Sequence, residues 1–465
     1  MVHNARLWGR FTTVLAALFL TLGSLYASDH GLFHYSGNTE KFLVGIGIMG
    51  LGYALSWRLL DRPLRGLWFW AVALVPRLIF LPMYPGSDIW RYLWEGYVQM
   101  EGFSPYDFPP NAATLEPFRT SWWVLINHPD VSAIYPPLAQ LAFRSLSFFT
   151  QPQLPPVEPA LLAFKLAFVV TDLVICALLW RRFKARAIIY AWNPLVIYSF
   201  SGGGHYDSWL MLPLVVAWLF DRDELADDSP WRLAPLLQAL LVGVSIGIKW
   251  VSLPVVGFLA WRQLQSARGL WPRWGMAIAI GIVGLLPIAL SALVYCDAAS
   301  CPLVPVDSEF VTVERSADLL PYLVKQVWPA SALSNSWIAL PLGLVTLVLL
   351  LRCRTLGQFI LAYLLALLVC TPIIRAWYFT WVVPFAVGVR WRSGLKPVPS
   401  WGGILGSLSV FAYYNYIIKL TAGDVDWNIS PWVRSLLWVP FIGGCLWTLY
   451  QQRQAQSAIE LEDAL

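Results

Sequence analysis

The chain has 465 residues, of which 58% are hydrophobic and 13% are charged, whereas about 25% of the residues in an average soluble domain are charged. Its formal net charge of +5 does not indicate nucleic-acid binding, because the Lys and Arg residues fall in short loops between apolar segments. This composition excludes a soluble globular protein. It predicts an all-α, polytopic membrane protein that forms one transmembrane domain over residues 1–465.

Apolar segments recur along the whole chain. A membrane-spanning helix needs about 20 apolar residues, and on that basis we expect roughly 12–14 spans. Residues 233–261 are too short for two full spans and are interrupted at Pro254, which predicts two short or partly inserted helices. The candidate segments are residues 11–27, 41–57, 66–81, 159–180, 187–200, 206–220, 233–249, 251–261, 274–295, 335–351, 356–371, 376–390, 401–419 and 432–450.

The loops that are rich in Lys and Arg predict the orientation. Such loops remain on the cytoplasmic side. If successive spans cross the membrane in alternating directions and both termini are cytoplasmic, all of these loops lie on the cytoplasmic side. The same path puts two long loops outside. The first, residues 82–158, is expected to carry interfacial amphipathic helices, and the second comprises residues 296–334. In the second loop, Cys296 and Cys301 either form a disulfide in an oxidising compartment or remain free thiols.

Residues 83–110, MYPGSDIWRYLWEGYVQMEGFSPYDFPP, form a charged and aromatic segment after the third apolar run. Ser87 is a candidate N-cap and Asp88 lies in the first turn of a predicted amphipathic helix at the outer interface. Arg91 and Glu95 are four residues apart and are expected to form a solvated ion pair. Asp88 is either a functional acid or a residue that caps the helix and faces its dipole.

Several ionisable residues fall within or beside apolar runs, where such groups indicate function or a buried pair. Arg77 and Asp172 lie inside predicted spans, and we expect them to pair and hold helices together. Three more residues, His205 in SGGGHYD, Lys249 and Arg375, reach the predicted outer face. Their convergence predicts a site. The alternatives are an ordinary loop with a helix cap for His205, and side chains that snorkel to the interface for the two cations.

Five segments in order resemble the GT-C superfamily of membrane glycosyltransferases. The closer likeness is to the polyprenol-phosphomannose-dependent mannosyltransferases and their bacterial relatives. The segments are SDIWRYLWEGYVQMEGFSPY, NHPDVSAIYPPLAQLAF, NPLVIYSFSGGGHYDSWLMLPL, GIKWVSLPVV and RAWYFTWVVPFA. The resemblance implies a GT-C-like fold in a bacterial plasma membrane. It also implies transfer of a hexose, expected to be mannose, from a polyprenyl phosphate to an acceptor hydroxyl on the periplasmic or extracellular side. A β-linked donor would give an α-linked product by inversion.

Such a transfer requires a base for the acceptor hydroxyl and cations for the departing phosphate. Asp88 is the candidate general base, and we expect a hydrophobic lid to raise its pKa toward neutrality. Arg375, Lys249 and His205 are the candidate phosphate-binding residues. The candidate residues for the acceptor are His128, Asp130, Tyr135, Asp207, Arg91 and Tyr378.

The expected partners are the polyprenyl-phosphate-linked sugar, a lipid or glycan acceptor and membrane lipids, with no nucleic acid. No cofactor is expected. A divalent metal on His128, His205 and Asp88 is an alternative that no ligand spacing supports. Two other functions remain open. A flippase or transporter for lipid-linked sugars would favour inverted internal repeats, and the sequence contains none. A polymer ligase or polymerase using a lipid-diphosphate donor would have a similar hydropathy pattern.

Overall fold

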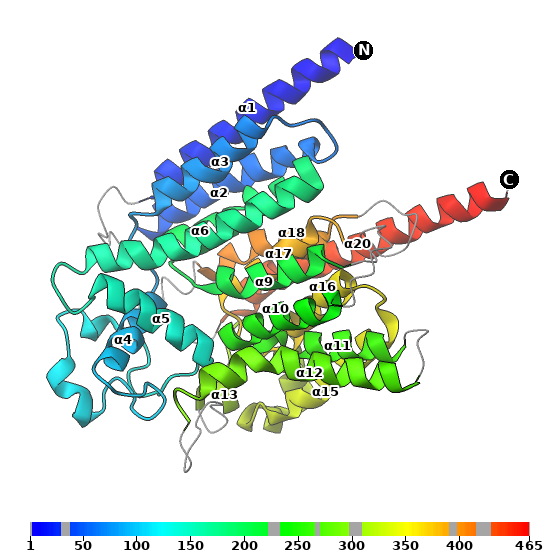
Figure 1. The fold of residues 1–465 in the computed structure, drawn as a ribbon. Helices are drawn as coiled ribbons and strands as arrows, with labels where there is room; N and C mark the ends of the chain where they lie inside the picture. The colour runs from blue at the N-terminus through cyan, green and yellow to red at the C-terminus, as the bar shows by residue number, and fades with distance from the viewer. Residues whose placement is uncertain are drawn as a thin grey trace.

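A computed structural model of the chain describes residues 2–28, 38–221, 233–265, 270–296, 309–389, 398–414 and 429–464. This part of the chain is a bundle of helices with almost no β structure (Figure 1). Its longer helices are α1 (Val2–Ala27), α2 (Thr39–Ser56), α3 (Gly66–Phe80), α4 (Asp88–Met100), α5 (Pro137–Thr150), α6 (Glu158–Phe183), α9 (Asp207–Leu219), α10 (Ala234–Ile248), α11 (Leu253–Leu264), α12 (Leu270–Ala292), α14 (Leu320–Val327), α15 (Ala339–Arg352), α16 (Leu356–Cys370), α18 (Trp401–Ser409) and α20 (Pro431–Ala464).

The helices confirm an all-α, polytopic membrane protein. In the described residues, five helices are long and apolar enough to cross a membrane, namely Trp8–Ala27, Thr39–Leu59, Glu158–Ala191, Leu270–Ala292 and Pro431–Ser457. The shorter apolar helices are Gly66–Phe80, Asp207–Leu219, Ala234–Ile248, Ser336–Arg352 and Leu356–Cys370. The prediction of two short helices in residues 233–261 is confirmed, because α10 ends at Ile248 and α11 begins at Leu253.

A segment that was expected to span the membrane is broken into short pieces. Residues 187–200 contain α7 (Ile188–Ala191), α8 (Pro194–Ile197) and the start of a π-helical turn. The break occurs because Pro194 has no N–H to continue the preceding helix and instead begins a new one. Asn193 caps the new helix and donates to the Ser407 hydroxyl at 2.8 Å. Irregular backbone of this kind is tolerated at membrane depth where protein buries it.

The expected ion pair between the spans is confirmed. Nε of Arg77 on α3 lies 2.5 Å from Oδ2 of Asp172 on α6, and both side chains are almost fully buried. The Arg77 guanidinium also donates to the carbonyls of Ala73 and Ala191. The Arg77 guanidinium therefore joins three helices. A charge is tolerated in a protein interior when it is paired and its donors have hydrogen-bond partners, as they are here.

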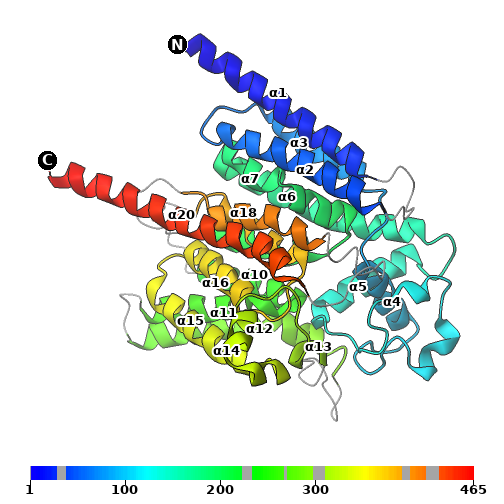
Figure 2. The same cartoon turned by 180° about the vertical axis from the view of Figure 1, so that it is seen from behind.

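The first long loop, between α3 and α6, packs as a separate lobe at one end of the bundle, while both termini project from the opposite end (Figures 1 and 2). The lobe contains α4 and α5. The expected solvated polar face of α4 is wrong, because residues from Ile89 to Gln99 are all buried, including the polar ones. The rest of the loop covers the polar face that the helix was expected to present to water.

Candidate active site

Residues from five segments meet at the end of the bundle that carries α4 and α5. They come from the start of α4, the glycine-rich turn before α9, the end of α10, the loop before α14, and the turn after α16. The last of these turns leads into a short helix, η9 (Ala376–Trp381). Every residue predicted to bind the donor phosphate lies in this region.

Asp88 occupies the first turn of α4 with its carboxylate toward the other segments. Its Oδ1 accepts a hydrogen bond from the amide of Asn127 at 2.7 Å, and its Oδ2 lies 3.6 Å from Nδ1 of His205. The carboxyl side chain is 17% exposed, so a small molecule can reach it. Ser87 stands at the N-cap position but makes no capping hydrogen bond. Its hydroxyl instead accepts from the Asn127 amide at 3.3 Å.

The pKa of Asp88 is low, which corrects the expectation that it would be raised. Burial acts to raise the pKa of this carboxyl, but the interactions with His205, Arg375 and Asn127 lower it to about 2. Because Nδ1 of His205 is too far away for a hydrogen bond, we attribute its effect on the pKa of Asp88 to electrostatic attraction between the two side chains. Opposite charges favour the ionised form. Asp88 is therefore a carboxylate throughout the physiological pH range.

The glycine-rich turn that carries His205 has steric reasons for its composition. Gly204 has a φ of +71°, a conformation that side chains disfavour. A Cβ on Gly203 would lie 2.9 Å from the His205 ring. The turn is tied to the segment before α4 by a hydrogen bond from Gly86 N to Gly203 O at 2.9 Å. His205 itself stacks on the Trp377 ring at a centroid distance of 3.6 Å. Its position opposite Asp88 is thus set by backbone and packing together.

Asp207 and Lys249 form a second charged pair. Nζ of Lys249 lies 2.8 Å from Oδ1 of Asp207, which also accepts from Nε1 of Trp381 at 2.7 Å. Oδ2 of Asp207 is buried and, among the described residues, has no hydrogen-bond partner. The rings of Tyr206, Tyr378 and Trp381 surround the Lys249 ammonium at 5.4, 4.7 and 4.9 Å. Lys249 therefore faces an aromatic cage and a carboxylate instead of snorkelling to solvent.

Arg375 joins the second long loop to the site. Its Nη2 lies 2.9 Å from Oε1 of Glu314, and the two side chains are 14% and 25% exposed. The backbone around Arg375 is tied to the same loop, since Ser316 N donates to Pro372 O at 2.9 Å and Ile374 N donates to Ser316 O at 2.8 Å. Arg375 also acts on Asp88 through its charge. In the same loop Cys296 is disulfide-bonded, while Cys301 lies outside the described residues.

The other predicted site residues are distributed unevenly. Tyr378 stacks on Trp381 at 4.3 Å, and Tyr135 packs edge-on against Tyr206 at 5.4 Å, so both belong to the cluster. His128 and Asp130 are exposed on the loop before α5. The loop brings Asn127 to Asp88. The sequence analysis did not identify Asn127, although it directly precedes His128. Trp377, Trp381 and Glu314 were also missed. The first two lie inside RAWYFTWVVPFA, and Glu314 carried no sequence signal.

The expectation that Arg91 and Glu95 form a solvated pair is wrong. Nε of Arg91 lies 2.6 Å from Oε1 of Glu95, and the side chains are 5% and 1% exposed. Arg91 also donates to the carbonyls of His128 and Val131, and Gln140 donates to Oε2 of Glu95 at 2.6 Å. Burial raises the pKa of Glu95. These bonds hold the loop that presents Asn127 to Asp88, so Arg91 acts on the site through that loop.

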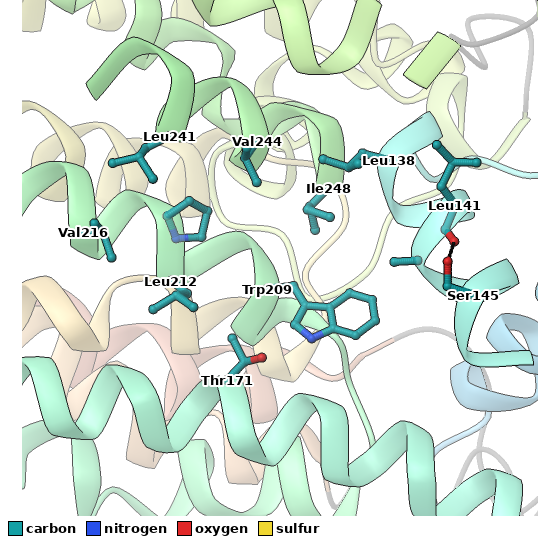
Figure 3. Close-up of a pocket in the computed structure, with 12 residues that line it drawn as sticks. Leu138, Leu141, Ser145, Thr171, Trp209, Leu212, Val216, Leu241, Val244 and Ile248 are labelled. Atoms are coloured by element: carbon teal, nitrogen blue, oxygen red, sulfur yellow. Dashed lines mark hydrogen bonds between the residues drawn. The ribbon is translucent and has the colours of Figure 1, made fainter. Parts of the chain in front are cut away.

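An apolar cavity of about 580 Å³ lies beside the charged cluster, between α5, α6, α9 and α10 (Figure 3). Trp209 lines it two residues after Asp207, and Ile248 lines it directly before Lys249. Nearly all of its walls are hydrophobic side chains, among them Leu138, Leu141, Leu212, Val216, Leu241 and Val244. A long hydrocarbon is the chemistry that this surface matches.

Within the described residues, no group of three or more His, Cys, Asp and Glu side chains is arranged to hold a metal ion. Asp88 and His205 approach each other, while the exposed His128 contributes its backbone carbonyl to Arg91. The cluster can thus supply an ionised carboxylate, two fixed cations and a histidine. It can also supply aromatic faces that suit a sugar ring.

Comparison with known families gives one match. Residues 21–265, more than half of the chain, match the family described as "Alpha-(1->6)-mannopyranosyltransferase, N-terminal domain". The matched range includes Asp88, Asn127, His205, Asp207 and Lys249. Searches of curated proteins and of solved structures found no match. The chain therefore belongs to the alpha-(1->6)-mannopyranosyltransferase family and is a membrane-bound glycosyltransferase.

Proposed function

We propose that the chain transfers mannose from a polyprenyl-phosphate donor to an acceptor hydroxyl, with inversion, at the outer face of a bacterial plasma membrane. The α-(1→6) linkage in the family's description is the linkage we propose for the product. The observation that carries the proposal is the juxtaposition of the Asp88 carboxylate with Arg375 and His205, with Lys249 in the same cluster. A base and a set of cations on one face are what sugar-phosphate transfer requires.

In the proposed reaction, the acceptor oxygen bonds to the anomeric carbon as the bond from that carbon to the phosphate oxygen breaks. The electron pair of the breaking bond leaves with polyprenyl monophosphate, and Asp88 takes the proton of the acceptor hydroxyl. A carboxylate with a pKa of about 2 is a weak base. It is sufficient if proton transfer comes late, because the acceptor oxygen becomes strongly acidic once it bonds to an oxocarbenium-like carbon.

Arg375, Lys249 and His205 are proposed to hold the phosphate, and Nδ1 of His205 also lies 3.6 Å from Oδ2 of Asp88. Arg375 offers a planar fork and Lys249 a point charge. In the structure each is paired with a carboxylate, Arg375 with Glu314 and Lys249 with Asp207. Because Glu314 is the more exposed carboxylate of the two, we propose that it is the one that gives way when the phosphate binds.

The apolar cavity supports a lipid-linked donor over a soluble sugar nucleotide. Its lining residue Trp209 comes two residues after Asp207, and Ile248 directly precedes Lys249, so a prenyl chain bound there is proposed to bring its phosphate to the cations. Tyr135 and Tyr378 are proposed to stack on the sugars, while His128, Asp130 and Asp207 are proposed to contact the acceptor. Arg91 is proposed to act on the acceptor through the loop that it holds.

A transfer assay separates this proposal from its alternatives. Purified protein is given radiolabelled polyprenyl-phosphate mannose and a native lipid extract as acceptor. We expect label in a new product, with one polyprenyl monophosphate released per sugar transferred. Label that crosses a vesicle membrane without forming a product would instead indicate a flippase. Transfer only from a lipid-diphosphate donor would indicate a ligase or polymerase. Linkage analysis of the product tests the α-(1→6) assignment.

A further inference from the structure

A second cavity lies at the opposite end of the helices from Asp88. It has a volume of about 460 Å³ and lies between the loop that joins α2 to α3 and the turn after α6. α3 begins beside this cavity and ends at Phe80, shortly before Asp88. α6 runs the other way and ends at the cavity with Phe183. The cavity is therefore on the face of the bundle away from the candidate active site, and nothing in the proposed reaction uses it.

The walls of this cavity combine aromatic and cationic side chains. Its apolar part includes Trp180, Phe183 and Leu64, and the Trp180 ring is fixed by stacking on Phe69 at a centroid distance of 4.3 Å. The charged side chains that line it are Arg62, Lys184, Arg186 and Asp61. Three cations thus face one carboxylate. That carboxylate is 78% exposed and lies 2.7 Å from Nη2 of Arg186, so a surplus of positive charge remains at the cavity.

Lys184 occupies a backbone position that does not suit a lysine. Its φ is +52°, in the region that glycine adopts readily and that other side chains disfavour. A glycine is the usual residue just after a helix where the chain takes a positive φ. Strain of this kind persists where the surrounding structure enforces it and often marks functional positions. Here the residue that bears the strain supplies one of the three cations.

We propose that this cavity binds the phosphate of an anionic phospholipid from the membrane leaflet on that face. Arg62, Lys184 and Arg186 would hold the phosphate through charge-assisted hydrogen bonds. The acyl chains would continue along the first turn of α3, where Leu67 is 80% exposed and Trp68 is 37% exposed. The apolar wall and this exposed helix surface favour a lipid over a soluble anion. Basic cavities between helices commonly recognise anionic headgroups.

The experiment uses the full chain in nanodiscs that contain equal amounts of phosphatidylglycerol and phosphatidylcholine. Native mass spectrometry then counts each lipid on the released protein, and a titration of phosphatidylglycerol gives the apparent affinity of the first bound molecule. The test variant is Arg62→Gln/Lys184→Gly, in which the glycine removes a cation and relieves the positive φ together. The matched control is Arg352→Gln/Arg354→Gln, which removes two cations near the end of α15, away from the cavity.

We expect the wild type to retain phosphatidylglycerol in preference to phosphatidylcholine. The test variant should bind the first phosphatidylglycerol about fivefold more weakly for each cation removed, while the control stays within about twofold of the wild type. Equal retention by the test variant would overturn the proposal. An equal loss in the control would also overturn it, because diffuse positive charge would then explain the binding. Displacement of the lipid by millimolar inorganic phosphate would show a site for soluble anions and overturn the lipid assignment.

Discussion

Two groups of charges in this protein are built differently. The pair of Arg77 and Asp172 is closed, because both side chains are at most 1% exposed and the guanidinium also donates to two backbone carbonyls. The cluster around Asp88 is open. Its Asp88, Lys249 and Arg375 side chains are 17%, 16% and 14% exposed, and a buried oxygen of Asp207 has no partner among the described residues. A closed pair can only stabilise the fold, whereas an open cluster can exchange one of its members for a ligand.

The largest expected effect is on the open cluster, at Asp88. Asp88→Asn should fold and still bind the donor, since Asn keeps the size and shape of the side chain. Because it cannot accept the proton, transfer should fall by about 10²–10⁴-fold. Asp88→Glu should recover little, since a catalytic group tolerates a displacement of only about 0.5 Å. Steady-state transfer assays measure both. Near-normal transfer by the Asn variant, with an equally active Asp107→Asn control from the same loop, would remove Asp88 from the role of base.

Substitutions in the closed pair should instead change the free energy of unfolding. Asp172→Asn leaves the buried Arg77 charge unmatched and should lower the free energy of unfolding by about 3–5 kcal/mol. Asp61→Asn, which breaks the exposed pair with Arg186, should cost at most about 1 kcal/mol. Unfolding in detergent, followed by circular dichroism, compares the two. The double variant Arg77→Met/Asp172→Leu should regain most of the loss. If Asp172→Asn were no less stable than Asp61→Asn, Arg77 and Asp172 would not form a closed pair.

Arg375 tests the open cluster at its proposed contact with the phosphate. Arg375→Ala should weaken use of the donor by about 10–100-fold in kcat/KM, the range expected for the loss of a charge-assisted hydrogen bond worth about 1.5–3 kcal/mol. Arg375→Lys should restore part of this, because the charge returns without the bidentate fork. Arg119→Ala, which removes an arginine of the first long loop, is the control. Unchanged donor kinetics in a folded Ala variant would make Arg375 an interfacial side chain.

The pH dependence tests how the cluster lowers the pKa of Asp88. A base must be ionised, so kcat/KM should be lost as the pH falls through the pKa of the carboxyl, which is about 2 in the folded protein. The wild type should therefore show no acid limb from Asp88 near pH 4–5. His205→Gln removes an interaction that opposes the effect of burial on the pKa of Asp88, so its acid limb should move to higher pH. Asn127→Ala should move it in the same direction by less. Identical profiles in all three proteins would contradict this electrostatic account.

The sequence predicted those parts of the structure that depend on local pattern or on rare residues. Apolar length predicted the helices, and the Arg77–Asp172 pair followed from two charges inside apolar runs. The sequence also indicated that Lys249 and Arg375 are cations on one face, and the structure brings both to the Asp88 cluster. Each of these inferences needs only the type of a residue and its position relative to the membrane-spanning segments. The amino-acid sequence contains both pieces of information.

What could not be predicted depends on partners far away in the sequence. The polar face of α4 appeared solvated, but Gln140 covers Glu95 from 45 residues away, and Tyr295 donates to Gln99 from 196 residues away. The pKa of Asp88 was expected to rise because burial could be anticipated, whereas the opposing charges of His205 and Arg375 could not. Glu314 was missed for the same reason, since only the folded loop places it on Arg375.

The smallest expected effect concerns that contact between Glu314 and Arg375. If the cluster is open, Glu314 competes with the donor phosphate for the same guanidinium, and weakening the pair should help the donor to bind. The pair is partly exposed, so its removal should be worth about 0.2–1 kcal/mol, which corresponds to a KM for the donor that is lower by up to about fivefold. Glu314→Gln keeps the size of the side chain and removes its charge.

Because Glu314 makes no contact with the reacting atoms in the proposed reaction, kcat should stay near that of the wild type. Glu116→Gln, at an exposed acid in the first long loop, is the control and should leave both constants unchanged. Substitutions in the closed pair should behave differently, since no substitution of Asp172 should lower the KM for the donor. A raised KM in Glu314→Gln would mean that Glu314 positions Arg375 for the phosphate and does not compete with it. In that case the Arg375–Glu314 pair would belong with the closed group.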